Sequence, residues 1–225
     1  SLPPPVARYL RVAGVVGQPA ARGFRVRFTG HIRKSAAAPW MPFTAEQRST
    51  VDPPARLFFM SARMSGLPVD GYHRYLDGAA SMRVKVLSAI GVVDASGPAF
   101  TATETVTLFN DLCVMAPAAL IDPAIRWEPV DENTVRATFT AAGHTVRAVL
   151  VFNVAGELAN FWSDDRPALA PDGAHFEAQR WSTPLSDYRA FGPTRLASRG
   201  EARYAPPSGE YVYGEFLLTD VEYDR

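Results

Sequence analysis

Residues 134–164 read TVRATFTAAGHTVRAVLVFNVAGELANFWSD and predict three short antiparallel strands joined by tight turns. The expected strands cover residues 134–141, 144–153 and 158–164, where β-branched and aromatic residues are frequent. Gly143 and Gly156 fall between them, and glycine readily adopts the backbone conformation that such turns need. Because short loops keep consecutive strands adjacent, this segment is typical of an antiparallel meander.

Similar strand-length segments lie on both sides of the meander. They are expected at residues 24–32, 40–51, 57–64, 72–76, 81–87 and 125–130 before it, and at 177–182, 195–204 and 211–222 after it. Asp77-Gly78 gives the clearest hairpin, because both residues tolerate a positive φ in a tight turn. The alternation of apolar and polar residues predicts strands with one face on a core.

Two segments have helical patterns instead. The first dozen residues read as a short helix that begins with prolines. Residues 103–120 place Val106, Phe109 and Cys113 at helical spacing, and Pro117 ends or kinks that helix. Residues 166–175 carry two prolines and a glycine without periodicity, and are expected to form a loop near a pocket mouth.

This order of elements predicts a mainly β protein that forms a single domain over residues 1–225. We expect one large curved antiparallel sheet or half-open barrel, with the 103–120 helix against its concave face and a short N-terminal helix. The chain has 225 residues, 47% of them hydrophobic, so it can bury a core without disulfides or a structural metal. The open sheet edges favour a homodimer or need to be covered.

Composition and charge exclude several classes of partner. The 23 basic residues balance the 23 acidic ones, so nucleic acid is not expected as a partner. The longest apolar run, residues 112–121, is interrupted by Pro117 and is too short for a membrane span. A cytoplasmic location is the expectation, although the start without methionine leaves an exported or membrane-anchored form open.

Several short motifs are spread along the chain: Leu2-Pro-Pro-Pro-Val6, Trp40-Met-Pro-Phe43, Val51-Asp-Pro-Pro54, Tyr75-Leu-Asp-Gly78, Pro117-Ala-Ala-Leu120 and Arg126-Trp-Glu128. As a set they resemble a bacterial family that is defined only as a domain of unknown function. This resemblance implies one domain and no particular chemistry. The order of strands, helix, meander and strands is also similar to the half-open β-barrel of periplasmic lipoprotein carriers, which hold acyl chains between a curved sheet and helices. That similarity implies a lipid-like ligand.

The sequence contains none of the common catalytic motifs. It lacks a Gly-x-Ser-x-Gly elbow, a phosphate-binding glycine loop, His-Glu-x-x-His and Cys-x-x-Cys, and its four histidines are far apart. We therefore expect no cofactor and no metal. Glu104 and Asp111 are the candidate catalytic residues, because they are acidic residues on an apolar helix. Either Glu104 caps the N-terminus of the helix and Asp111 faces solvent, or one of the two faces an apolar cavity where desolvation raises its pKa for acid or base catalysis.

The abundant aromatic residues can supply both a core and the lining of a pocket. The expected ligand-binding residues are Trp40, Phe59, Tyr75, Leu108, Met115, Trp162 and Trp181. The leading hypothesis is the binding of a small hydrophobic or lipid-like molecule between the sheet and the helix. The alternatives are a cofactor-free cyclase, isomerase or dehydratase that uses a pocket carboxylate, and an interaction protein with a filled core.

Overall fold

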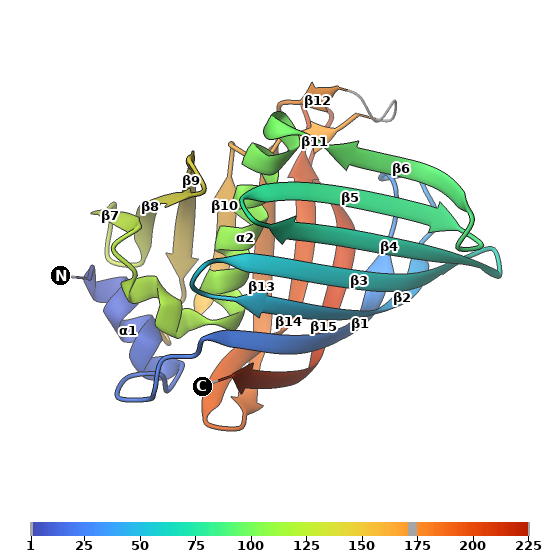
Figure 1. Cartoon of the computed structure of the whole chain (residues 1–225). Coiled ribbons are helices and arrows are strands. Elements are labelled where there is room, and N and C mark those ends of the chain that lie inside the picture. Colours follow the sequence, from blue (N-terminus) through green and yellow to red (C-terminus); the bar gives the residue numbers. More distant parts are fainter. Residues whose placement is uncertain (1, 171–174, 225) are drawn as a thin grey trace.

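One sheet dominates the computed structural model, which describes residues 2–170 and 175–224. Within those residues, thirteen strands form a single antiparallel sheet in the order β6-β5-β4-β3-β2-β1-β15-β14-β13-β10-β9-β8-β7, and β11 and β12 form a separate pair. The large sheet curves strongly and stays open (Figure 1). This confirms the predicted mainly β fold with one curved antiparallel sheet.

The elements have the following bounds. The helices are α1 (Pro4–Val12), α2 (Pro98–Met115) and the 3-10 helix η1 (Pro117–Ile121). The first strands are β1 (Gly23–Ile32), β2 (Met41–Thr50), β3 (Ala55–Met64), β4 (Leu67–Leu76), β5 (Ala79–Val86) and β6 (Ile90–Ser96). The strands after α2 are β7 (Ile125–Pro129), β8 (Thr134–Ala141), β9 (His144–Phe152), β10 (Leu158–Ser163), β11 (Ala168–Leu169), β12 (Phe176–Glu177), β13 (Arg180–Phe191), β14 (Thr194–Ala205) and β15 (Tyr211–Asp224).

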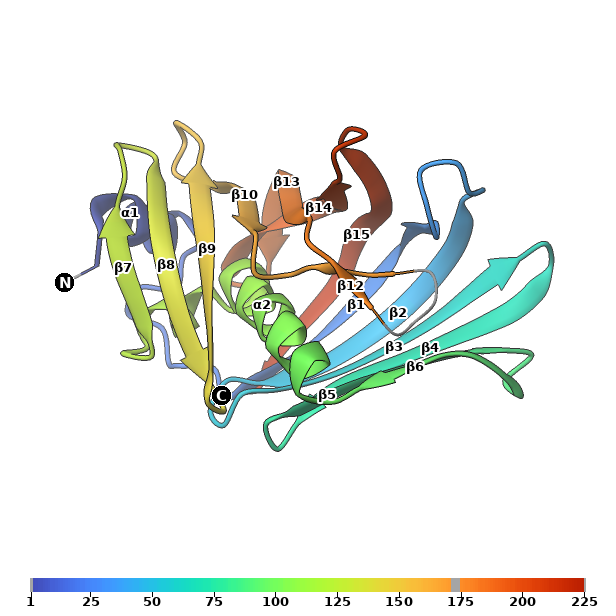
Figure 2. The same cartoon turned by 90° about the horizontal axis from the view of Figure 1, so that it is seen from above.

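Helix α2 lies inside the curve of the sheet (Figure 2). Nearly all of its residues are buried, including the polar ones, because it packs against strands of both halves of the sheet. The Phe109 ring stacks on that of Phe139 of β8, with 4.9 Å between their centroids. The helix therefore separates a packed core on the side of β8 and β9 from the concave face of β1–β5.

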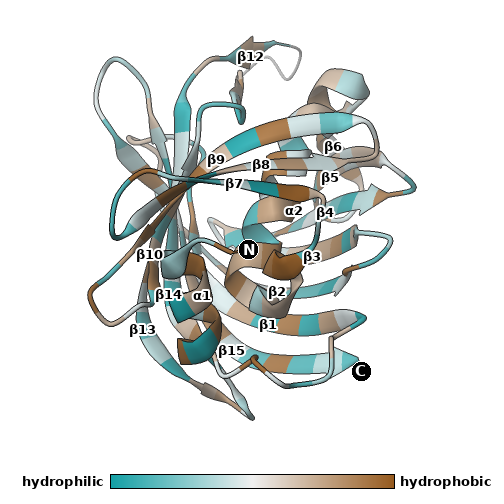
Figure 3. Cartoon of the chain, turned by 90° about the vertical axis from the view of Figure 1, so that its left-hand side faces the viewer, coloured by the Kyte–Doolittle hydropathy of each residue, from teal (hydrophilic) through white to brown (hydrophobic). Residues whose placement is uncertain are grey.

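Helix α1 packs at the β8 end of the sheet (Figure 3). Val6 and Tyr9 are fully buried there, and the Tyr9 hydroxyl donates a hydrogen bond to the Cys113 carbonyl at 2.9 Å. Cys113 itself is fully buried. The predicted N-terminal helix is confirmed, and its contacts hold the C-terminal end of α2 in place.

The meander and the Asp77-Gly78 hairpin are confirmed, with positive φ angles of 52° and 73° at the two turn residues. The predicted start of the long helix was wrong: α2 begins at Pro98, so Glu104 lies in its second turn. Proline after Gly97 is a favourable first helical residue, and that signal marks the start better than the acidic residue does.

One strand was predicted in the wrong place and another was not predicted. The strand expected at 177–182 runs in the structure as β13 from Arg180 to Phe191, and β6 was not predicted. Pro184 lacks the N–H that a central strand needs, which favours a break, and β13 accommodates it where its pairing with β14 skips residues. Of the loop expected at 166–175, residues 171–174 lie outside the described part, and residues 168–169 pair with 176–177.

The ends of the large sheet are β6 and β7. No helix within residues 2–170 and 175–224 is long and apolar enough to cross a membrane.

Candidate ligand-binding site

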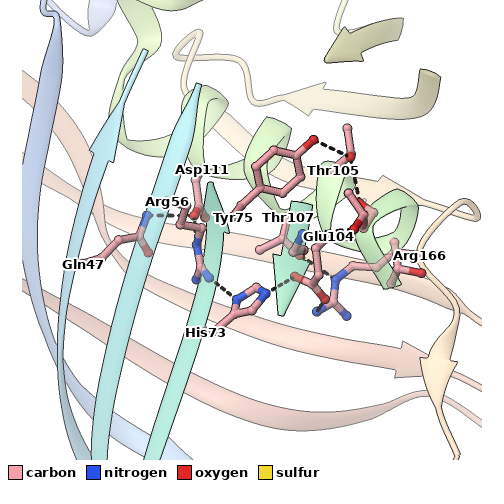
Figure 4. Close-up of polar contacts among 12 residues, drawn as sticks. Gln47, Arg56, His73, Tyr75, Glu104, Thr105, Thr107, Asp111 and Arg166 are labelled. Carbon is pink, nitrogen blue, oxygen red and sulfur yellow. Dashed lines mark hydrogen bonds and ion pairs between the residues drawn. The ribbon is translucent and has the colours of Figure 1, made fainter. Parts of the chain in front are cut away.

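A cavity of about 250 Å³ lies between the concave face of the sheet and α2. Strands alternate their side chains between two faces, so every second residue of β3 points toward this cavity. Arg56, Phe58 and Met60 line it, whereas Leu57 and Phe59 are 37% and 50% exposed on the convex face. Most of the cavity wall is apolar, and a cluster of polar side chains gathers beneath α2 (Figure 4).

Asp111 of α2 connects the helix to strands β2 and β3. Its Oδ2 accepts hydrogen bonds from Arg56 Nε at 2.6 Å and from Gln47 Nε2 at 2.8 Å. The Arg56 and Asp111 side chains are only 9% and 11% exposed. A buried charge is very unfavourable unless it is paired, so each of these two residues depends on the other.

His73 of β4 lies between Arg56 and Glu104 (Figure 4). Arginine is always protonated and can only donate, so we assign the lone pair of the ring to Nδ1, which accepts from Arg56 Nη1, and the proton to Nε2. His73 Nε2 lies 3.2 Å from Glu104 Oε2, and neither atom has a well-aligned hydrogen bond within the described residues. The imidazole is therefore neutral and points its N–H toward the carboxylate.

Arg166 completes the cluster from the segment between β10 and β11. Its guanidinium donates to Thr107 Oγ1 at 2.8 Å, to Glu104 Oε1 at 3.2 Å and to the Tyr204 hydroxyl. It also stacks on the Trp181 ring, with 4.5 Å between Cζ and the ring centroid. Cation–π contact and ion pairing together compensate for the burial of this charge.

The electrostatics of the cluster are balanced. Two arginines face two carboxylates, and burial lowers the pKa of His73 from 6.5 to about 4 against the attraction of Glu104. Burial acts to raise the pKa of Glu104, but Arg166, His73 and Arg56 together hold it below its ordinary value. For Asp111 burial prevails, and its pKa lies above the ordinary value despite the contact with Arg56.

This arrangement is suited to hydrogen bonding more than to metal or thiol chemistry. No group of three or more His, Cys, Asp or Glu residues in the described part of the chain could hold a metal ion. Burial raises the pKa of the Cys113 thiol well above its ordinary value, so the thiol does not ionise easily. The cluster offers N–H donors and carboxylate acceptors next to an apolar space.

Both predicted carboxylates line the cavity. Glu104 and Asp111 are 4% and 8% exposed, so neither is a solvated or capping residue. The other expected site residues divide into three groups. Met115 and Trp181 line the cavity. Tyr75 and Leu108 are buried in the core, where the Tyr75 hydroxyl lies 3.2 Å from Thr105 Oγ1.

Trp40, Phe59 and Trp162 do not line the cavity. Trp40 is 37% exposed, and Phe59 lies on the convex face because its neighbours Phe58 and Met60 occupy the concave one. Trp162 stacks with the guanidinium of Arg180, 3.8 Å from its ring centroid. None of the three rings therefore faces a ligand bound in this cavity.

Sequence reasoning missed most polar members of the site, among them Gln47, Arg56, His73 and Arg166. These four come from β2, β3, β4 and the segment after β10, so no local spacing connects them. The available signal was their alternation: Arg56 and His73 occupy the same strand face as Phe58 and Tyr75, which are apolar positions.

The fold resembles that of a domain from Vibrio parahaemolyticus described as a candidate outer membrane lipoprotein-sorting protein. The TM-score is 0.54 at 9% sequence identity, over 97% of this chain and 93% of that chain. A DUF1329 family protein from Desulfovibrio piger and a LolA superfamily protein from Nitrosomonas europaea each align at a TM-score of 0.49 and 10% identity over 98% of this chain, and over 92% and 93% of their own chains.

A comparison with curated proteins finds no significant match. The sequence pattern that defines the family of unknown function DUF6544 matches residues 1–216. Since this match covers nearly the whole chain, the protein belongs to the DUF6544 family.

Proposed function

We propose that this protein binds a small hydrophobic or lipid-like molecule in the cavity between the sheet and α2. The observation that carries the proposal is the cavity itself, which has mostly apolar walls and a cluster of polar groups beneath α2. Protein interiors are normally packed without such spaces, and this combination of surfaces is typical of ligand sites. Its volume of about 250 Å³ suits a small molecule or one segment of a chain.

The likeness to the Vibrio domain supports the same proposal. That domain is described in terms of lipoprotein sorting, and its alignment covers 97% of this chain. Fold does not determine function, so the likeness adds an analogy to the argument from the cavity.

The alternative of a cofactor-free acid–base enzyme rests on Glu104 and Asp111. Each carboxylate is already engaged by an arginine, Arg166 and Arg56 respectively. A general acid or base has to exchange its proton with a substrate, but the ion pair with Arg166 opposes protonation of Glu104. Burial raises the pKa of Asp111, but its Oδ2 is already engaged by hydrogen bonds from Arg56 and Gln47. Ligand binding without chemistry therefore stays the better-supported function. The cytoplasmic location and the homodimer stay predictions.

The first experiment is native mass spectrometry of the purified protein, followed by titration with an uncharged fluorescent hydrophobic dye. We expect a bound hydrophobic companion or one saturable site. The matched variants are Met60→Trp, which places an indole in the cavity, and Phe59→Trp, which places it on the convex face of the same strand.

Met60→Trp should weaken binding at least tenfold, and Phe59→Trp should leave it unchanged. Thermal unfolding of both variants checks that each is folded. The absence of a companion together with no saturable binding would contradict the proposal. Equal binding by two folded variants would place the ligand elsewhere.

A further inference from the structure

The concave face continues beyond the cavity as an apolar cluster, which we call the outer strip. Its buried residues are Phe43, Ala45, Ala62 and Val69, and partly buried apolar side chains pack around them. This cluster is separate from the main core around α2. Several of its partly buried members, among them Phe58, Met60 and Val84, also line the cavity, so the two surfaces are continuous.

Strand register shows how the strip extends. Met60 pairs with Gly71, and Gly71 pairs with Val84, in the row that borders the cavity. The next row outward on the same face is Ala62, Val69 and Val86. Beyond that row, Met64 and Leu67 at the β3–β4 turn are 41% and 46% exposed. The strip thus leads from the cavity to an open apolar edge.

Three adjacent strands change from polar to apolar in the same direction along this face. On β3 the order is Arg56, Phe58, Met60 and Ala62, and β2 and β4 follow the same gradient. The corresponding residues are Gln47, Ala45 and Phe43 on β2, and His73, Gly71 and Val69 on β4. From Arg56 to Met64 the strand spans about 26 Å, at roughly 3.3 Å per residue.

We infer that the ligand is a single-chain amphiphile with an uncharged hydrogen-bonding head, bound with its head beneath α2 and its chain along the outer strip. This inference rests on the proposed function and specifies the class and the orientation of its ligand. The orientation follows from the change from polar to apolar residues that β2, β3 and β4 share. An amphiphile fits this order only when its polar head lies beneath α2 and its chain extends along the outer strip.

The charge balance selects an uncharged head. Arg56 and Arg166 already pair with Asp111 and Glu104, so a carboxylate or ammonium head would add an uncompensated buried charge. A hydroxyl or carbonyl oxygen needs only a donor. Arg56 lines the cavity, and its Nη2 has no hydrogen-bond partner among residues 2–170 and 175–224. That nitrogen is the donor we assign to the head.

The class of ligand is tested by titrating the protein with decanol, decanoate and decylammonium at neutral pH. We expect decanol to bind at least tenfold more tightly than either ion. If decanoate or decylammonium binds as tightly as decanol, the uncharged head is refuted while the hydrophobic site remains. If none of the three binds and the uncharged dye also fails, the proposed function itself is refuted.

The orientation is tested by photo-crosslinking with decanol that carries a diazirine at the chain end. Labelling should fall on peptides that contain Ala62, Val69 or Val86. Labelling of α2 around Asp111 would show the reverse orientation and overturn the inference.

A pair of variants gives a second readout of the same orientation. Val86→Asn introduces a polar group on the outer strip, and Val92→Asn makes the same change at an exposed position of the neighbouring strand that does not line the cavity. Val86→Asn should weaken decanol binding at least fivefold and leave the shorter butanol unaffected, and Val92→Asn should change neither. Equal effects of the two variants would overturn the placement of the chain.

Discussion

Mild acid should destabilise this protein through His73. The pKa of that imidazole is about 4 in the folded protein against 6.5 ordinarily, because burial disfavours the cation and Arg56 repels it. Between pH 4 and pH 6.5, His73 therefore binds a proton more readily in the unfolded chain than in the folded protein. Stability is complete above pH 6.5 and is lost as the pH falls toward 4, since the folded pKa is the lower one.

The magnitude follows from the size of the shift. Between about pH 7 and pH 5 the linkage amounts to roughly 2 kcal/mol of unfolding free energy, at about 1.4 kcal/mol per unit. The assay is urea unfolding at both pH values for the wild type and for His73→Gln. Glutamine offers one acceptor and one donor without a titratable proton, so it keeps the contacts to Arg56 and Glu104.

The comparison isolates one group, because every other titrating residue is common to both proteins. The wild type should lose about 2 kcal/mol more than His73→Gln over this pH range. Equal losses would refute the neutral, buried imidazole. If His73→Gln is already unfolded at neutral pH, His73→Asn takes its place. Asparagine keeps the same two hydrogen-bonding functions on a shorter side chain.

Three further perturbations test the packing and the ion pairs. Glu104→Gln leaves the Arg166 charge buried without its counter-ion and should lower the unfolding free energy by about 3–5 kcal/mol, whereas a loss under about 1 kcal/mol in urea unfolding would contradict the ion pair. Phe109→Ala removes the ring stacked on Phe139 and should cost about 3–5 kcal/mol, which calorimetry can measure; a cost typical of a surface residue would contradict the packing. Replacing Arg56 and Asp111 together by Met and Leu removes both charges but leaves His73 Nδ1 without its donor, so it should cost about 1–3 kcal/mol in urea unfolding. The same change should weaken decanol binding at least tenfold, and unchanged binding would remove Arg56 from the site.

Local patterns were enough to predict most of the fold. The meander and the Asp77-Gly78 hairpin depend on residues within a few positions of each other, so composition and turn chemistry determine them. The errors came from elements that local rules disfavour. Pro184 sits inside β13 because the pairing of β13 with β14 leaves a gap there, which is a property of the sheet and not of the segment.

The site was predictable only where it lies on one element. Glu104 and Asp111 are recognisable as acidic residues on an apolar helix, and both line the cavity. Arg56 and His73 reach the same place through the pairing of β3 with β4 and the curvature of the sheet, which no spacing in the sequence encodes. Phe59 was predicted to bind the ligand, whereas its neighbour Met60 lines the cavity. A shift of one residue along a strand moves a side chain from the concave face to the convex one.

The position of the buried charges argues for a role in binding. Replacing buried ion pairs by apolar residues of similar size is often neutral or stabilises a fold by about 1–4 kcal/mol, so stability alone does not account for two such pairs beneath one helix. Helix α2 already has an apolar contact with the sheet through Phe109, and the charges lie on its other side, where the cavity begins. Buried ion pairs that add little to stability are expected where they serve another role, such as contact with a ligand. The open space that Arg56 and Glu104 line is the cavity between the sheet and α2.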